Sequence, residues 1–361
     1  MTYPSGPYGY GYAPPPPPPK PGVIPLAPLG LSQILTGAFA TIGRYWKQLL
    51  GVATAAFGGA LLLVAAVGGL AYAAVADHVP RVFDLPGGQE PSWDDGRPLL
   101  VAFGLVWLVA MVGMLVASAV VYAACPAVLQ EAVLGRRTTF GAVWRRSWSR
   151  MPSVIGTVFL TMLVVFVPVA LFMGAMIGFM IALVTAASST GSGGSDSAMT
   201  ASGFALVALL VALATMPLAT WIWVKLSLAP TAAVFEGQGA TASMRRSGEL
   251  VRGSWWRIFG ALLVAGLMAG MANWLIQQVL STLLSFPVSL TAASDVETPG
   301  EVMIALVPVL VIAVVGGMLA QAVCSVFPPL VTGLVYVDQR IRKENLAPAL
   351  VQAAGTPPFS P

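Results

Sequence analysis

Residues 153–187 read SVIGTVFLTMLVVFVPVALFMGAMIGFMIALVTAA, a run without a single charged side chain. This run exceeds the roughly 20 apolar residues that an α-helix needs to cross a hydrocarbon core of about 30 Å. Further apolar runs occupy about 48–76, 98–125, 201–229, 258–290 and 302–337. The sequence therefore predicts an all-α integral membrane protein with six transmembrane helices.

The positive charges lie in alternate gaps between the apolar runs. Sixteen of the 18 Lys and Arg residues precede the first run, separate the second from the third and the fourth from the fifth, or follow the sixth. The other gaps hold Arg81 and Arg97 against nine acids. Because Lys- and Arg-rich loops stay cytoplasmic during insertion, we expect a multi-pass protein of the cell (inner) membrane with both termini inside. Its basic charge then requires no nucleic-acid partner.

The two ends of the chain differ from the middle in composition. Residues 1–30 are rich in Pro, Gly and Tyr and include the run Pro14 to Pro19. Such a segment cannot bury a core, so we predict a disordered cytoplasmic tail over 1–30, followed by a membrane domain over 31–346. Residues 347–361 are expected to form a second disordered tail.

Landmarks inside the membrane domain recur at a nearly constant period. Gly51, Gly156 and Gly260 are 105 and 104 residues apart, and Pro126 and Pro230 are 104 apart. A constant period indicates one unit used repeatedly. We predict three units, at about 31–126, 137–230 and 240–329, each comprising two spans preceded by a cytoplasmic-side amphipathic helix and all packed in one bundle.

The predicted amphipathic segments carry the first set of candidate site residues. Apolar and aromatic residues line one helical face of each segment, and bases flank that face in the second and third. Basic amphipathic helices with aromatic anchors lie in the membrane interface, although packing on the bundle would explain the same pattern. The candidate contacts to anionic headgroups are Arg136, Arg137, Trp144, Arg145, Arg146, Trp148, Arg150, Arg245, Arg246, Arg252, Trp255, Trp256 and Arg257.

A second set of candidate site residues lies within the spans. Between their interfacial ends, the spans contain no Asp, Glu, Lys, Arg or His. Coupled carriers mark their pathways with such groups. The uncharged polar residues at depth are Asn273, Gln277, Gln278 and Gln321. They either hydrogen-bond between helices or line a cavity.

The sequence lacks the usual groups of an enzyme site. Its one histidine, His78, lies in an acidic outer loop without metal-ligand spacing, and no nucleotide or hydrolase motif is present. We therefore expect no catalytic residue, no metal and no cofactor.

Three stretches resemble a known family: PGVIPLAPLGLSQILTGAF (21–39), RRSGELVRGSWWRIFG (245–260) and YVDQRIRKENL (336–346). They are similar to actinobacterial membrane proteins related to the membrane domain that precedes the catalytic domain in some bacterial glycerophosphodiester phosphodiesterases. The resemblance implies six spans close to envelope lipids, and it implies no reaction.

These observations favour a non-enzymatic membrane protein that organises or assists envelope components through its basic interfacial helices. Its expected partners are anionic membrane lipids or a protein on the cytoplasmic side. The alternative is an uncoupled channel or permease for a lipid or small molecule.

The charge pattern makes a topology prediction. A reporter placed after Lys343 or within 137–150 should report cytoplasm, and one within 84–95 or 190–198 should report the outside. An outside signal from 137–150 would contradict the prediction, because a cluster of five arginines would then have crossed the membrane.

Overall fold

The computed structural model describes residues 22–83, 92–136, 138–189, 195–292, 299–346, 348–350 and 352. Six of its helical stretches are long and apolar enough to cross a membrane, and only 6% to 22% of the most apolar window of each is buried. Such exposed apolar surface requires a lipid solvent, so the predicted six-span all-α class is confirmed. The elements are α1 (Leu31–Val75), η1 (Ala76–His78), α2 (Val79–Phe83), α3 (Trp93–Val133), α4 (Phe140–Ser189), α5 (Ser195–Leu226), α6 (Ala229–Glu236), α7 (Ala240–Val251), α8 (Trp255–Ala292), α9 (Pro299–Cys324) and α10 (Phe327–Glu344).

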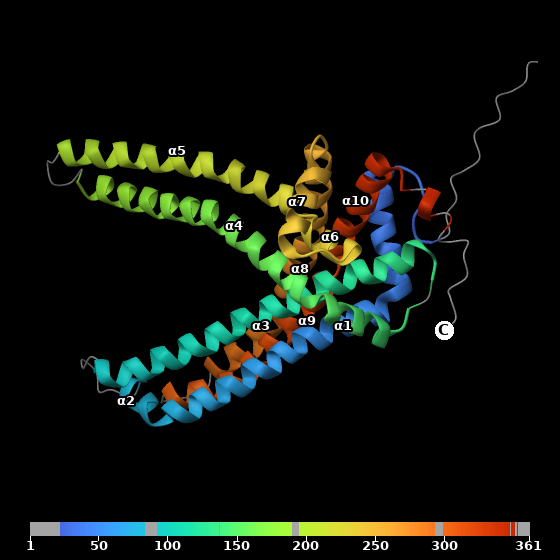
Figure 1. Ribbon diagram of the computed structural model, residues 1–361. Coiled ribbons are helices and arrows are strands. Elements are labelled where there is room, and N and C mark those ends of the chain that lie inside the picture. The colour runs from blue at the N-terminus through green and yellow to red at the C-terminus, as the bar shows by residue number, and fades with distance from the viewer. Residues whose placement is uncertain are drawn as a thin grey trace, which may run out of the picture.

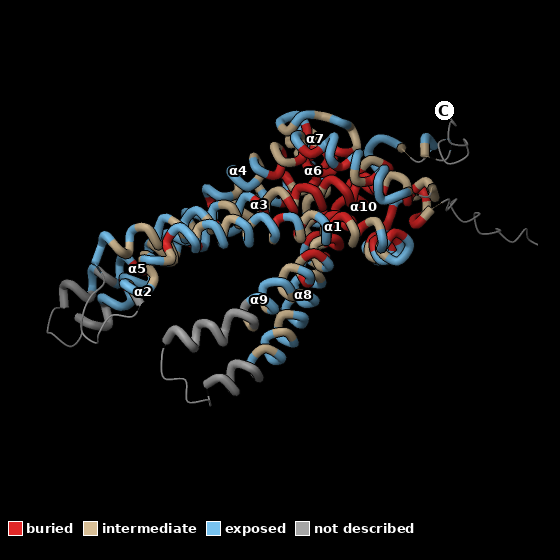
Figure 2. Tube along the Cα trace, turned by 90° about the horizontal axis from the view of Figure 1, so that it is seen from below, coloured by how far each residue is buried: buried red, intermediate tan, exposed pale blue. Residues whose placement is uncertain are grey.

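Three helical hairpins extend as arms from one common end: α1 with α3, α4 with α5, and α8 with α9. The α4–α5 arm diverges from the α1–α3 arm in Figure 1, and the α8–α9 arm diverges from the others in Figure 2. Figure 2 shows that the buried residues concentrate at this common end, which we call the hub. The hub contains α6, α7, α10, the start of α1 and the end of α3. The arms diverge instead of closing into the single bundle that we expected. Because lipid tails solvate apolar side chains as well as another helix does, hydrophobicity does not draw the arms together within a bilayer.

Each predicted unit contributes one arm, but the amphipathic segments differ in form. The third is a separate helix, α7, whereas the second is the first part of α4. The first is the start of α1, which departs from helical geometry at Tyr45 (φ −119°, ψ 24°). The threefold relation between the units remains a prediction.

The hub core begins where each returning helix reaches a proline. Pro126 lies within α3, and prolines occupy the first turns of α6 and α10, where a missing N–H costs little. The residues that follow these prolines are almost all buried. α10 crosses α3 closely at Gly333, where an added Cβ would lie 2.6 Å from Leu129 Cδ2. Three return helices thus end in one shared core.

Residues 22–29 belong to this core, which corrects the predicted tail boundary at residue 30. Ile24 and Leu29 are fully buried, and the Val23 N–H donates to the Ala132 carbonyl oxygen at 3.2 Å. An added Cβ at Gly22 would lie 2.1 Å from that oxygen, so only glycine fits there. Within the predicted C-terminal tail, residues 348–350 are helical. The disorder predicted for 1–21 and 353–361 lies outside the described residues.

A buried carboxylate joins three separate parts of the hub. Asp338 on α10 is fully buried and accepts a hydrogen bond from the Leu29 N–H at 2.7 Å. The same carboxylate pairs with Arg257 at 3.1 Å and with Arg342 at 2.9 Å. Both guanidinium groups also donate to the Leu29 carbonyl oxygen. The cluster therefore fixes the N-terminal segment and α8 against α10.

We expect Asp338→Asn to lower the free energy of unfolding by about 2 kcal/mol, because hydrogen bonds to a charged group contribute about 1.5–3 kcal/mol and the partly exposed Arg257 and Arg342 would lose their carboxylate partner. The measurement is thermal unfolding of the full chain in detergent, followed by tryptophan fluorescence. Arg81→Gln is the control, since it breaks an exposed pair with Asp95 at the far end of the first arm, and such pairs contribute only about 0–1 kcal/mol. Equal midpoints for the two variants would contradict the prediction.

Candidate functional site

Two of the predicted headgroup-binding arginines are held by carboxylates of the hub. Arg257 pairs with Asp338, as described above. Arg246 Nε donates to Glu236 at 2.9 Å, and its guanidinium also pairs with Glu344. Burial opposes the charged form of Arg246, but the hydrogen bonds to the two carboxylates outweigh it and raise the pKa of Arg246. These two arginines hold the hub together.

The arginines at the start of α4 are less enclosed. Arg146 donates to Gln130 Oε1 at 2.5 Å and lies 3.4 Å from Glu131, which ties α4 to the end of α3. Arg145 is exposed, and Arg150 donates to the Gly237 carbonyl oxygen at 3.5 Å. The Arg136 carbonyl accepts a hydrogen bond from Tyr45 at 2.7 Å. Arg137 lies outside the described residues.

Aromatic side chains stack along the first turns of α4 and α8. Trp144 stacks between Phe140 and Trp148, at centroid distances of 6.0 and 5.9 Å. Trp255 stacks on Phe259 at 5.1 Å and meets Trp256 edge-on at 4.7 Å. Trp256 is 78% exposed and Trp148 57%. These exposed indoles lie where the apolar arms meet the polar hub, as interfacial anchors do.

A groove of about 580 Å³ lies between α5, α7 and the start of α8. Two tryptophans and three bases are among the residues that line it. The full lining is Trp221, Lys225, Met244, Arg245, Gly248, Glu249, Val251, Arg252, Gly253 and Trp255. The Lys225 ammonium lies 4.7 Å from the Trp221 ring centroid. Because Gly248 has no side chain, the Lys225 stem can run beside it, with Cε 3.4 Å from an added Cβ. The groove thus offers positive charge beside a flat apolar wall.

The charges around this groove do not cancel. Three bases face one carboxylate, Glu249, which pairs with Arg245 at 3.3 Å. Lys225 and Arg252 form no salt bridge with any described residue and are exposed. The Trp255 Nε1 group is buried without a hydrogen-bond partner among the described residues, which costs about 1–3 kcal/mol until an acceptor arrives. An anion in the groove would supply the missing negative charge.

The turn that carries Arg252 is fixed from behind by α10. The Lys343 ammonium donates to the carbonyl oxygens of Glu249, Leu250 and Arg252 at 3.2, 2.9 and 2.6 Å. A base at these carbonyls caps the C-terminus of α7 and complements its dipole. Gly253 follows with φ +82°, a conformation that glycine adopts without strain. The groove is therefore held in place before any ligand binds.

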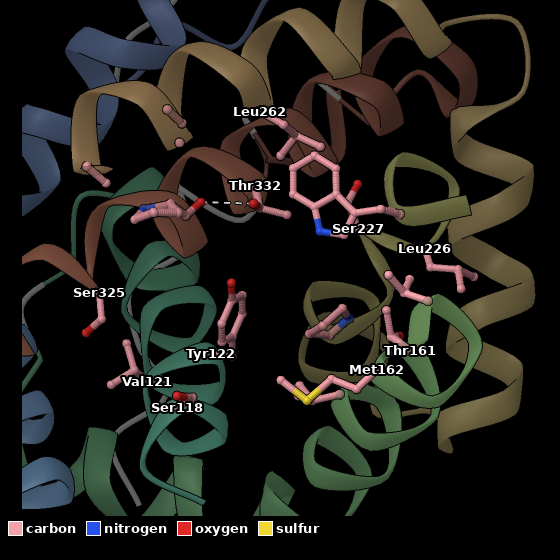
Figure 3. Close-up of a pocket in the computed structure, with 18 of the residues that line it drawn as sticks. Ser118, Val121, Tyr122, Thr161, Met162, Leu226, Ser227, Leu262, Ser325 and Thr332 are labelled. Carbon is pink, nitrogen blue, oxygen red and sulfur yellow. Dashed lines mark hydrogen bonds between the residues drawn. The ribbon is translucent and has the colours of Figure 1, made fainter. Parts of the chain in front are cut away.

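A second cavity, of about 780 Å³, lies where the three arms join the hub (Figure 3). Its labelled side chains come from α3 (Ser118, Val121, Tyr122), α4 (Thr161, Met162), the end of α5 (Leu226, Ser227), α8 (Leu262) and the α9–α10 region (Ser325, Thr332). The lining is mainly apolar, and none of the described residues that form it is charged.

The predicted intramembrane polar cluster divides around this cavity. Asn273 and Gln321 both line it, so the structure brings these two together. Gln277 instead packs between helices, with Nε2 3.3 Å from a Cβ added at Gly317 on α9, and Gln278 is exposed. His78 lies on η1 at the tip of the first arm. Within the described residues no three His, Cys, Asp or Glu side chains are grouped to hold a metal.

The sequence analysis missed the hub residues that position the groove. Asp338, Glu236, Tyr336 and Lys343 were not singled out, yet the Tyr336 hydroxyl donates to Glu236 at 2.5 Å and Lys343 caps α7. The sequence did contain one indication of these contacts: Asp338 and Arg342, and likewise Arg340 and Glu344, are four residues apart, the spacing of ion pairs on one helical face. Both are i,i+4 pairs that the structure confirms.

The arms and hub thus define a six-span helical membrane protein with a basic groove at one end. Residues 29–330 match the family described as Domain of unknown function (DUF7847), and the chain belongs to that family. Searches of curated proteins and of solved structures found no match.

Proposed function

We propose that this protein is a non-enzymatic integral membrane protein that binds anionic phospholipid at headgroup level and thereby organises the lipid around it. The observation that carries the proposal is the groove between α5, α7 and α8. There Lys225 and Arg252 have no carboxylate partner among the described residues, and two tryptophans form the wall. In the topology expected from the charge pattern, this groove faces the cytoplasmic side.

The position of the groove fits a lipid headgroup. Exposed apolar side chains continue along α5 and α8 away from the hub, including Leu218, Leu263 and Leu267. A lipid whose acyl chains lie along that surface would bring its phosphate to Lys225 and Arg252. Each base near an anionic leaflet contributes about 1 kcal/mol, and the aromatic wall favours the interface over bulk water.

The second candidate function is an uncoupled permease for a lipid or small molecule. The observation that favours it is the cavity at the junction of the arms, which Asn273 and Gln321 line. Transport would require this cavity to open alternately toward both sides of the membrane. Lipid binding requires only the conformation described here, so we place it first.

The test is the thermal stability of the detergent-purified full chain, measured with added phosphatidylglycerol and with phosphatidylcholine of the same chains. A ligand that binds only the folded state raises the midpoint, and at equal concentration the ligand of higher affinity raises it more, because the stabilisation grows with the logarithm of the ratio of ligand concentration to Kd. We expect phosphatidylglycerol to give the larger rise. Lys225→Gln and Arg252→Gln should each weaken its affinity roughly fivefold, because about 1 kcal/mol is lost for each base.

Arg97→Gln is the matched control, since it removes an equally exposed base at the far end of α3. Arg145→Gln tests whether the effect belongs to the groove or to every exposed base of the hub end. Trp255→Phe keeps the ring that stacks on Phe259 and removes the N–H. Equal stabilisation by the two lipids, or an unchanged response in the Lys225→Gln, Arg252→Gln double variant, would refute the proposal.

A further inference from the structure

The cavity at the arm junction owes its space to a face of small residues on α8. Ala265, Gly266, Ala269 and Gly270 all line it. Glycines at this spacing usually let two helices approach closely, but a Cβ added at Gly266 or Gly270 would meet no atom within 4 Å. Ala265 packs in the hub core, but no described neighbouring helix fills the space beside the two glycines, so this space opens into the cavity.

The cavity is accessible from the bilayer. Met162 and Phe166 on α4 line it and are nevertheless 54% and 64% exposed. Side chains that line the cavity and are also exposed on the outside of the protein show that the cavity is open on that side. Both belong to a predicted membrane span, so the opening faces lipid chains.

The chemistry of the lining excludes a charged occupant. No described lining residue carries a charge, and bringing a phosphate into such surroundings without a counter-charge would cost several kcal/mol. The polar groups are hydroxyls and amides, including Ser118, Thr161, Asn273 and Gln321. An occupant must therefore be apolar over most of its length and neutral at its polar end.

Two lining atoms lack hydrogen-bond partners. Thr161 Oγ1 and Asn273 Oδ1 are both buried without a partner among the described residues. The nearby Thr157 hydroxyl, by contrast, donates to the Ser153 carbonyl oxygen at 2.6 Å. Buried polar atoms are paired in most proteins, and an amide oxygen needs a donor. A hydroxyl on the occupant would provide that donor.

We propose that this cavity is a binding site for a membrane lipid with an uncharged hydroxyl head, of the diacylglycerol type. Its acyl chains occupy the space beside Gly266 and Gly270, and its hydroxyl bonds to Asn273 Oδ1 and Thr161 Oγ1. Cavities of about 300–1,000 Å³ accommodate ligands of this kind. The site is separate from the basic groove, and it takes an uncharged lipid where the groove takes an anionic one.

The experiment measures labelling of the detergent-purified full chain by a photoreactive diacylglycerol. We expect saturable labelling that maps to α4 and α8, with competition by unlabelled diacylglycerol. Phosphatidic acid with the same chains should compete at least tenfold less well, because its phosphate has no counter-charge in the cavity. Gly270→Leu should lower the affinity at least tenfold by filling the space. Asn273→Leu should lower it by removing the acceptor.

Thr161→Val conserves volume and tests the hydroxyl alone, should either larger change disturb folding. Gly174→Leu is the matched control, because it adds the same side chain on α4 at a site with no atom within 4 Å and outside the cavity. Equal competition by phosphatidic acid, or labelling unchanged in Gly270→Leu and Thr161→Val, would overturn the assignment. So would competition by a long-chain isoprenoid alcohol without any by diacylglycerol.

The two proposals fail separately in these experiments. The Lys225→Gln, Arg252→Gln double variant should keep its diacylglycerol labelling while losing its response to phosphatidylglycerol. Gly270→Leu should show the reverse. A loss of both properties in either variant would contradict the independence of the two sites.

Discussion

The hub depends on the hydrogen bond and the two ion pairs that the buried carboxylate of Asp338 makes. This carboxylate holds the backbone of Leu29 and the side chains of Arg257 and Arg342, and these belong to the N-terminal segment, α8 and α10. A buried charge without partners costs several kcal/mol. The Asp338 carboxylate is therefore fully stabilised only when the N-terminal segment, α8 and α10 have all come together. The hub therefore joins the N-terminal segment to helices that lie more than 200 residues later in the sequence. The groove beside α7 inherits its rigidity from this arrangement, since α10 also supplies Lys343.

The arms follow a different rule. Inside a bilayer each helix satisfies its own backbone hydrogen bonds, and lipid covers its apolar side chains. Contacts between helices then depend on local shape, as within the α8–α9 arm, where the Leu280 side chain lies 2.9 Å from a Cβ added at Gly316. Where shape does not match, as at Gly266 and Gly270, the helices stay apart. A dense hub and diverging arms are the result, with a cavity at the junction between them.

The groove and the cavity differ in charge because they lie at different depths. At the hub end, bases such as Lys225 and Arg252 are exposed, so their charge carries little desolvation penalty. Deeper in the arms a charge would be costly, and only hydroxyl and amide groups such as Thr161 and Asn273 remain. The cost of burying a charge increases with depth in the membrane. This cost limits which side chains occur at each level, and it would also limit which lipid headgroups bind there. Binding one lipid class at each level is consistent with a protein that organises lipid.

The sequence by itself determined the class of this protein. Spans such as 153–187, and the bases in alternate gaps between them, are features of local composition, and insertion into a bilayer depends directly on the hydrophobicity and charge of each segment. The sequence also located the aromatic and basic residues at the starts of α4 and α8. It did not separate the arginines by role: Arg257 and Arg246 looked the same as Arg252, and only the fold brought Asp338 and Glu236 to the first two. The burial of 22–29 was hidden for the same reason, since a Pro- and Gly-rich segment becomes part of a core only when distant helices surround it. Tertiary structure also decided that Asn273 lines a cavity while Gln277 packs between helices, because that difference arises from how far apart two neighbouring helices lie.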